Sequence, residues 1–415
     1  MTPHLIISDI YRPWYIIPVI AMLLWLFSTR HFTFLDEPPT QNERRSANVD
    51  GLRGFLALGV FLAHASGYAT YVTTGYWGGG PSLFFNLLGS AGVALFFIIT
   101  SYLFWGKAIA GASSIHDARE YCRYLSGLYL ARFFRIAPLY YFVIAFMLAI
   151  VLSVTGPHLY VSPARLFSEI CNWLLLGIGA NVWVNGYGGP PMMTGMVWTL
   201  GWEWYFYFSL AATSLVAFSR MGRLVFPVLI FAISALFILN GREASFSYII
   251  LFSTGMIFAA LPGRMLHVAL SKPAKSVAAL ILIAAVYSGV ATSHTLIQTL
   301  LIAALFYLII SGCDLFGLLR TRAAQRLGAI SYSIYLTHGI CLHLVFSNPR
   351  IAQFALGSVL QYWSVVLFAA VVVTVFSSLT FICIERPGIA IGRSLLRRSG
   401  LTRSKRPVPT TAATA

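Results

Sequence analysis

Long apolar segments recur along the whole chain, and they restrict its fold more than any other feature. About eleven are predicted, near residues 12–28, 52–70, 83–105, 136–155, 197–219, 224–240, 246–261, 276–292, 296–312, 328–346 and 360–384. A bilayer core of about 30 Å is crossed by roughly 20 apolar residues in a helix. Only 10% of the residues are charged, against about 25% in soluble domains. The sequence therefore predicts an all-α, polytopic membrane protein, with a core of about ten helices and one extra N-terminal transmembrane helix.

The net charge of +16 is carried by the loops between these segments. Lys and Arg are concentrated in the loops at 106–135, 220–223, 262–275 and 313–327. The positive-inside rule assigns these loops and the C-terminus to the cytoplasm. Few Lys or Arg occur in the loops at 71–82, 156–196, 241–245, 293–295 and 347–359, which are predicted to face outward. Residues 166–180 would break this alternation as a full span, so they are interpreted as re-entrant or interfacial.

Charge and cysteine usage exclude several classes of partner. The basic residues are split among short loops rather than gathered in one domain, so no nucleic-acid partner is expected. The five Cys residues are scattered without a CxxC pair, so neither a metal site nor a disulfide framework is expected. The sequence does not indicate an oligomeric state.

Three regions are predicted along the chain. Residues 1–45 are expected to form the extra helix and a cytoplasmic linker, and residues 46–390 the membrane domain. Residues 391–415 are basic and then rich in Pro, Thr and Ala, a composition that predicts disorder. The N-terminus has no basic stretch before a small-residue cleavage site, so no signal peptide is predicted.

Arg53 and His64 lie in one apolar segment, eleven residues apart. On a helix this spacing is about three turns, so both side chains share one face and lie about 16 Å apart along the axis. His64 then lies near the middle of the bilayer, either as a hydrogen-bonded core residue or as a functional group. We favour the functional interpretation, in which the imidazole is a general base.

Basic residues near the cytoplasmic surface are candidates for binding an anion. Arg53 is either a membrane-surface anchor or a clamp for phosphate or carboxylate. Arg132 and Arg135 are three residues apart on one helix face and can grip a polyphosphate together. With Arg53, Arg119 and Arg123, these two residues either form a cytoplasmic anion site or only set the membrane topology. Asp50 precedes Arg53 and is interpreted as a helix cap.

Two acids and a second histidine lie within or at the end of apolar segments. Glu203 has Trp and Tyr neighbours and is either a hydrogen-bond hub or a group that orients a catalytic imidazole. Glu385 ends the last segment and can pair with Arg386 or with another cation. His338 is a second, weaker candidate for the general base.

Two outward loops, 75–81 and 185–191, are rich in Gly and aromatic residues. Their rings are interpreted first as an interfacial aromatic belt and second as a surface that stacks on a sugar.

Six motifs in order resemble the acyltransferase-three family of integral-membrane acyltransferases, from about Asn48 to Pro387. They are Asp50-Gly51-Leu52-Arg53-Gly54 with His64, Phe96 to Leu103, Arg132-x-x-Arg135 with Pro138 and Tyr140, Trp198-Thr199-Leu200 with Glu203 and Phe206-Tyr207, Leu327 to His338, and Glu385-x-Pro387. The chain departs from the family pattern in two places. It has Thr100-Ser101-Tyr102 where the family often has Ser-Gly, and Gly201-Trp202-Glu203 where it often has Ser-Val-Glu.

The resemblance implies transfer of an acyl group, usually acetyl, from cytoplasmic acyl-CoA to a hydroxyl of an extracytoplasmic glycan. A bacterial surface polysaccharide such as lipopolysaccharide O-antigen is the expected acceptor, and the bacterial inner membrane the expected location. Catalytic roles are implied for His64, Glu203, Glu385 and His338, and substrate binding for Arg53, Arg132, Arg135, Asp50, Trp198 and Tyr332. Acetyl-CoA is expected as donor, and no metal.

Two other functions fit the same sequence. A transporter or flippase of an anionic or sugar substrate would also have many spans and buried charges, although no inverted repeat is evident. An acyltransferase acting on a lipid or a small secondary metabolite would have the same motifs and another acceptor.

Overall fold

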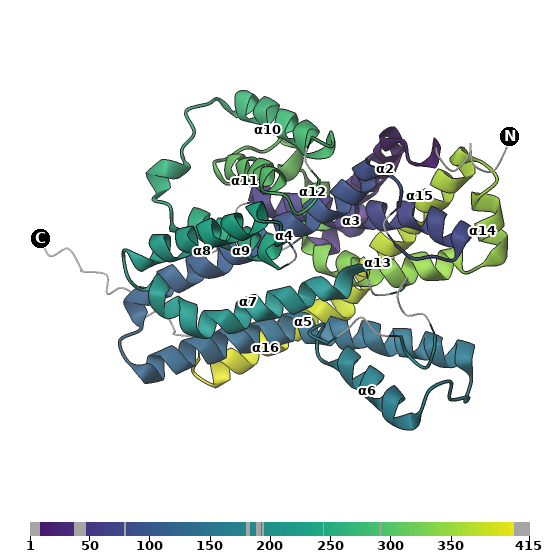
Figure 1. Cartoon of the computed structure of the whole chain (residues 1–415), viewed down its shortest axis with the longest axis horizontal. Helices are drawn as coiled ribbons and strands as arrows, with labels where there is room; N and C mark the ends of the chain where they lie inside the picture. Colours follow the sequence, from purple (N-terminus) through teal and green to yellow (C-terminus); the bar gives the residue numbers. More distant parts are fainter. Residues whose placement is uncertain are drawn as a thin grey trace, which may run out of the picture.

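The described part of the chain consists of helices joined by short loops (Figure 1). The structure is a computed structural model of the whole chain. It describes residues 9–36, 47–78, 80–179, 183–187, 192, 195–243, 245–290 and 292–401. These residues form no strand, and their one isolated bridge joins Val184 and Tyr187.

Five helices of this described part are long and apolar enough to cross a membrane. They are α3 (Ala47–Thr74), α4 (Leu83–Gly111), α5 (Ala118–Thr155), α8 (Gly222–Leu239) and the continuous helix Val359–Arg398. A sixth is α12 (Arg322–Ala329) taken together with α13 (Ser331–Phe346), although this pair is bent by 70°. These helices confirm the prediction of an all-α polytopic membrane protein.

The described part contains seven further α-helices. They are α2 (Ile16–Ser28), α6 (Pro163–Leu174), α7 (Gly195–Ala217), α9 (Phe246–Ala260), α10 (Lys272–Tyr287), α11 (Leu296–Ile310) and α14 (Pro349–Ala355). Short 3₁₀ turns connect several of them: η1 (Pro13–Tyr15), η2 (Arg30–Leu35), η3 (Ala112–Ser114), η5 (Gly263–Leu266) and η6 (Leu318–Arg320). Helix α6 is attached to α5, because the Tyr140 hydroxyl donates to the carbonyl of Trp173 at 2.6 Å.

The C-terminal helix is longer than the sequence predicted. Helix α15 (Val359–Thr380) passes through a π-helical turn, η7 (Phe381–Glu385), into α16 (Arg386–Arg398). Helix α16 runs along α5 (Figure 1). The prediction of a disordered tail is therefore wrong for residues 391–398, because packing on α5 overrides their polar composition. Residues 402–415 lie outside the described residues.

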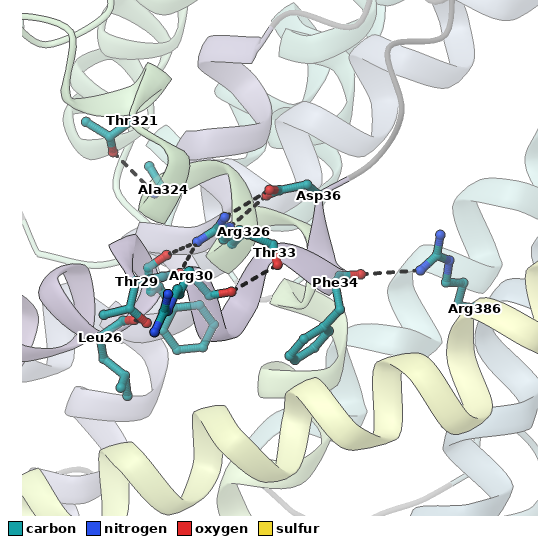
Figure 2. Close-up of polar contacts among 11 residues, drawn as sticks. Leu26, Thr29, Arg30, Thr33, Phe34, Asp36, Thr321, Ala324, Arg326 and Arg386 are labelled. Carbon is teal, nitrogen blue, oxygen red and sulfur yellow. Dashed lines mark hydrogen bonds and ion pairs between the residues drawn. The ribbon is translucent and has the colours of Figure 1, made fainter.

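An ion pair between buried Arg326 and half-exposed Asp36 fastens the N-terminal helix to the bundle (Figure 2). Arg326 of α12 is 2% exposed, and it donates to both carboxylate oxygens of Asp36 at 2.7 and 2.9 Å. It also donates to the carbonyls of Phe27 and Thr29, each at 2.7 Å. The hydrogen bonds from Arg326 hold the pKa of Asp36 below its ordinary value. The guanidinium thus satisfies two backbone carbonyls at the end of α2 and also forms an ion pair with Asp36.

Glycines bring α3 and α12 into backbone contact. A Cβ added at Gly328 would lie 2.1 Å from the carbonyl oxygen of Asp50. One added at Gly54 would lie 2.8 Å from the backbone nitrogen of Gly328. Small residues permit this approach in a membrane bundle, so the position of α3 against α12 depends on both glycines.

Gly328→Ala is expected to destabilise the protein, because a methyl group must push the two backbones apart. Overpacking of this kind costs about 1–3 kcal/mol. The measurement is thermal unfolding in detergent, with Gly263→Ala as the control, since nothing lies within 4 Å of a Cβ at Gly263. Equal unfolding temperatures for the two variants would contradict the proposed contact.

Candidate functional site

Side chains of α3, α4, α5, α7 and α13 line a cavity inside the bundle. It holds about 870 Å³ of empty space, its open mouth included. Five predicted site residues line it: Arg53, Arg132, Arg135, Glu203 and Tyr332. The structure therefore unites side chains that come from four segments of the sequence.

Three arginines give the cavity a cationic wall. The guanidinium of Arg132 lies 4.1 Å from the ring centroid of Phe104, a cation–π contact that fixes its plane. Arg53 lies one turn from Asp50, at 3.8 Å between Nη1 and Oδ1. Guanidinium groups match the oxygens of phosphate and carboxylate in two-pronged contacts. This wall is suited to an anionic ligand.

Glu203 faces the arginines from α7. Its Oε1 accepts from the Thr100 hydroxyl at 3.2 Å, and its Oε2 accepts from the Tyr207 hydroxyl at 2.9 Å. Both oxygens are thus engaged within the cavity wall. These contacts favour the hydrogen-bond hub over the alternative in which Glu203 orients an imidazole.

Glu385 is fully buried behind Arg135. Its Oε1 lies 3.5 Å from Nη2 of Arg135, and its Oε2 accepts from the Ser333 hydroxyl at 2.8 Å. Arg386 instead donates to the carbonyl of Phe34 (Figure 2). Of the two pairings predicted for Glu385, the one with Arg386 is wrong, because the π-helical turn directs the carboxylate inward.

The two candidate histidines are in direct contact. Nδ1 of His64 lies 2.9 Å from Nε2 of His338, and Nδ1 of His338 lies 3.0 Å from the carbonyl of Ile334. A carbonyl only accepts, so His338 carries its proton on Nδ1 and accepts on Nε2. His64 must then donate from Nδ1, which puts its lone pair on Nε2. This tautomer is the one in which His64 can take a proton through Nε2.

An aromatic cluster begins at His64 and continues into the first Gly-rich loop. The ring of Trp77 stacks on His64 at 6.1 Å between centroids. Tyr68 and Tyr71 contact the same indole at 5.0 and 5.8 Å. From the second aromatic loop, the Tyr187 hydroxyl lies 3.4 Å from Nε2 of His343. Residues 79 and 188–191 of the two loops lie outside the described residues.

Tyr335 joins the cavity to the histidine pair, and the sequence analysis missed it. Its ring lines the cavity and lies 6.1 Å from the ring of His338. Its hydroxyl is 2.6 Å from Oγ1 of Thr199 and donates to the carbonyl of Met196. A spacing of three residues before His338 was the signal that could have identified it.

Other predicted residues lie elsewhere or act differently. Asp50 is inside the first turn of α3, so its prediction as a helix cap is wrong; α3 begins earlier, at Ala47. Trp198 lines a second cavity rather than the first. The Tyr332 hydroxyl donates to the carbonyl of Ile136 at 2.9 Å. Among the residues that the structure covers, no cluster of three His, Cys, Asp or Glu side chains is placed to hold a metal.

Of the Tyr neighbours predicted for Glu203, Tyr207 makes the contact, four residues later on α7. The contact with Thr100 was not predicted. Thr100 belongs to the segment that departs from the family pattern, and its hydroxyl contacts the same acid.

Glu385→Gln is expected to lower the unfolding temperature, because Arg135 loses its buried counter-charge. The double variant Arg135→Gln/Glu385→Gln should recover part of the loss, with a coupling free energy of about 1–3 kcal/mol. Thermal unfolding of the two single variants and the double variant measures this coupling. Glu243→Gln, on an exposed loop, is the matched control. Strictly additive effects would mean that the pair contributes nothing.

The comparisons with known proteins give one match. A family model described as an acyltransferase domain matches residues 46–382, most of the chain. No curated protein and no solved structure matches the chain.

Proposed function

The chain belongs to the acyltransferase-three family of membrane acyltransferases, and from this premise we propose that it transfers an acyl group, usually acetyl, from acyl-CoA to a hydroxyl of an extracytoplasmic glycan. One observation carries the proposal. The arginine-lined cavity ends one aromatic ring away from a histidine pair whose tautomer leaves the lone pair on His64 Nε2.

The cavity has the properties that an acyl-CoA donor requires. Coenzyme A carries phosphate groups, which suit Arg53, Arg132 and Arg135. Its pantetheine arm is uncharged and suits the inner, largely apolar wall beyond these residues. The basic loops beside this end of the bundle support a cytoplasmic location, where acyl-CoA is available. In this arrangement the thioester lies near Tyr335 and the histidine pair.

The opposite side of His64 suits an acceptor. The indole of Trp77 stacks on the imidazole, and the phenol rings of Tyr68 and Tyr71 pack against that indole. Aromatic faces pack against the C–H faces of a sugar, while the hydroxyl to be acylated can reach Nε2. We expect this acceptor to be a surface polysaccharide of a bacterium, with the protein in the inner membrane and its C-terminus in the cytoplasm.

The transfer then follows from the proton positions. His64 takes the proton of the acceptor hydroxyl on Nε2 while that oxygen attacks the thioester carbonyl. The carbon–sulfur bond breaks, and the CoA thiolate recovers the proton from the imidazolium. His338 accepts from Nδ1 of His64 throughout, so it is a positioning residue that stabilises the charged ring. The products are an ester and the free thiol of CoA.

His64→Ala is expected to abolish acyl transfer while the protein still inserts and folds. Loss of a general base lowers rates by about 10²–10⁴-fold. The measurement is release of CoA thiol and labelling of glycan by purified protein in nanodiscs with radiolabelled acetyl-CoA. His158→Ala, in an exposed loop, should retain full activity. Undiminished transfer by His64→Ala would show that His64 is not the general base.

Mass spectrometry of the surface glycan separates this function from transport. A deletion strain should lose one acyl mass increment that the parent strain carries. A transporter or flippase would instead change substrate flux without a covalent change. If the increment is lost from a lipid or a small metabolite, the protein is still an acyltransferase, and its acceptor is that molecule instead of a glycan.

A further inference from the structure

A second cavity lies on the other side of α4. It holds about 500 Å³ of empty space, its opening included. Helices α4, α7, α9 and α11 and the loop before α11 line it, through Ser90, Ala91, Val93, Ala94, Trp198, Ser247, Tyr248, Leu251, Ser293, His294, Gln298, Thr299 and Ile302. Ser247, Tyr248 and Gln298 lie in the first turns of their helices. The cavity is therefore at the end of the bundle at which α9 and α11 begin.

Helix α4 separates this cavity from the histidine pair. A Cβ at Gly89 would meet Ala63 at 3.1 Å, and one at Gly92 would meet Val60 at 3.1 Å. That face of α4 therefore packs on α3, beside His64. Ser90 lies on the cavity side of α4. A ligand in this cavity does not touch His64.

The cavity contains a buried amide that has no partner among the described residues. Gln298 is 3% exposed, and neither its Oε1 nor its Nε2 makes a hydrogen bond. A buried polar group left unsatisfied costs about 1–3 kcal/mol, so it calls for an explanation. This side chain can accept one bond and donate two. It has the hydrogen-bonding capacity of a ligand-binding residue.

The other polar groups of the cavity are uncharged. The hydroxyls of Ser90 and Ser293 bond to each other at 2.8 Å. Burial lowers the pKa of His294, which favours its neutral form. The backbone of His294 has φ of +72°, a strained conformation for a residue other than glycine. None of the described lining residues is Asp, Glu, Lys or Arg, so the cavity suits a neutral ligand.

Two aromatic rings complete the wall. Trp198 and Tyr248 lie 5.0 Å apart with their planes tilted by 48°, and Tyr248 contacts the ring of His294 at 5.3 Å. Rings beside amide and hydroxyl groups bind a ligand that has apolar C–H faces and several hydroxyls. Charged ligands are disfavoured because nothing in this wall offsets their loss of hydration.

We propose that this second cavity binds a neutral sugar unit, with Gln298 as its central hydrogen-bonding residue. The inference does not depend on acyl transfer, because the bound unit is one helix away from His64. Trp198 would then contact the sugar unit and not the acyl-CoA donor proposed for the cavity with the three arginines.

Binding of neutral glucosides to purified full-length protein in nanodiscs tests the proposal. The probes are methyl β-D-glucopyranoside as a free sugar and octyl β-D-glucopyranoside as a membrane-anchored one. Saturation-transfer difference NMR gives the dissociation constants. Saturable binding is expected for at least one of the two glucosides. The glucoside with the lower dissociation constant shows whether the cavity takes a free or a membrane-anchored sugar. Methyl β-D-glucuronide, the anionic counterpart, should bind about tenfold more weakly.

Gln298→Leu should weaken glucoside binding about tenfold, because the amide bonds are lost. It should not lower the unfolding temperature, since it removes an unsatisfied buried group. Gln361→Leu, near the start of α15, is the matched control and should bind as the parent does. Ser293→Ala, in a loop position, should also weaken binding. The proposal is overturned if the parent shows no saturable binding in either arm, which leaves a cavity for water only, or if Gln298→Leu binds as tightly as the parent.

Discussion

The backbone contact between α3 and α12 decides where the reactive side chains lie. Gly54 and Gly328 let the backbones of the two helices approach to distances that no Cβ would permit. From each glycine the sequence advances ten residues and reaches a histidine, His64 on α3 and His338 on α13. The chain bends by 70° between α12 and α13, and α13 then brings the imidazole of His338 into hydrogen-bonding contact with that of His64. Without the close approach at their base, the helices would hold the rings too far apart for proton positions to be coupled.

Charge inside the bundle is tolerated because almost every charged group has a partner of the right geometry. Glu385 is paired with Arg135 and Ser333, and Arg326 is held by Asp36 and two carbonyls. An isolated buried charge would cost far more than either arrangement. The arginine wall of the first cavity follows the same logic. Arg53 lies beside Asp50 and Arg135 beside Glu385, and Glu203 faces the wall from α7.

Apolar length and residue spacing made much of this molecule predictable. Each apolar segment contains a helix, and the three-residue spacing of Arg132 and Arg135 correctly implied that both side chains face the same place, which is the first cavity. Other features depend on contacts between distant segments, which local patterns do not encode. The inward turn of Glu385 requires a π-helical turn, and the helix beyond residue 391 requires α5 to pack against. The tautomer of His64 requires a carbonyl on another helix. Trp198 shares a motif with Glu203 but lines a different cavity, because five residues place the two side chains about 140° apart around the helix.

Helix α4 divides the bundle into two chemically different compartments. Val93 lines both cavities, and the ring of Phe97, in the wall of the first, meets the ring of Trp198, in the wall of the second, edge to face at 6.4 Å. On one side of this partition lie three guanidinium groups, and on the other an amide, hydroxyls and aromatic rings without charge. The first cavity can offset the charge of an anion, and the second cannot. The two cavities therefore suit ligands that differ in charge rather than in size. Because the partition is only one side chain thick at Val93, the volume of that side chain sets the width of both compartments at once.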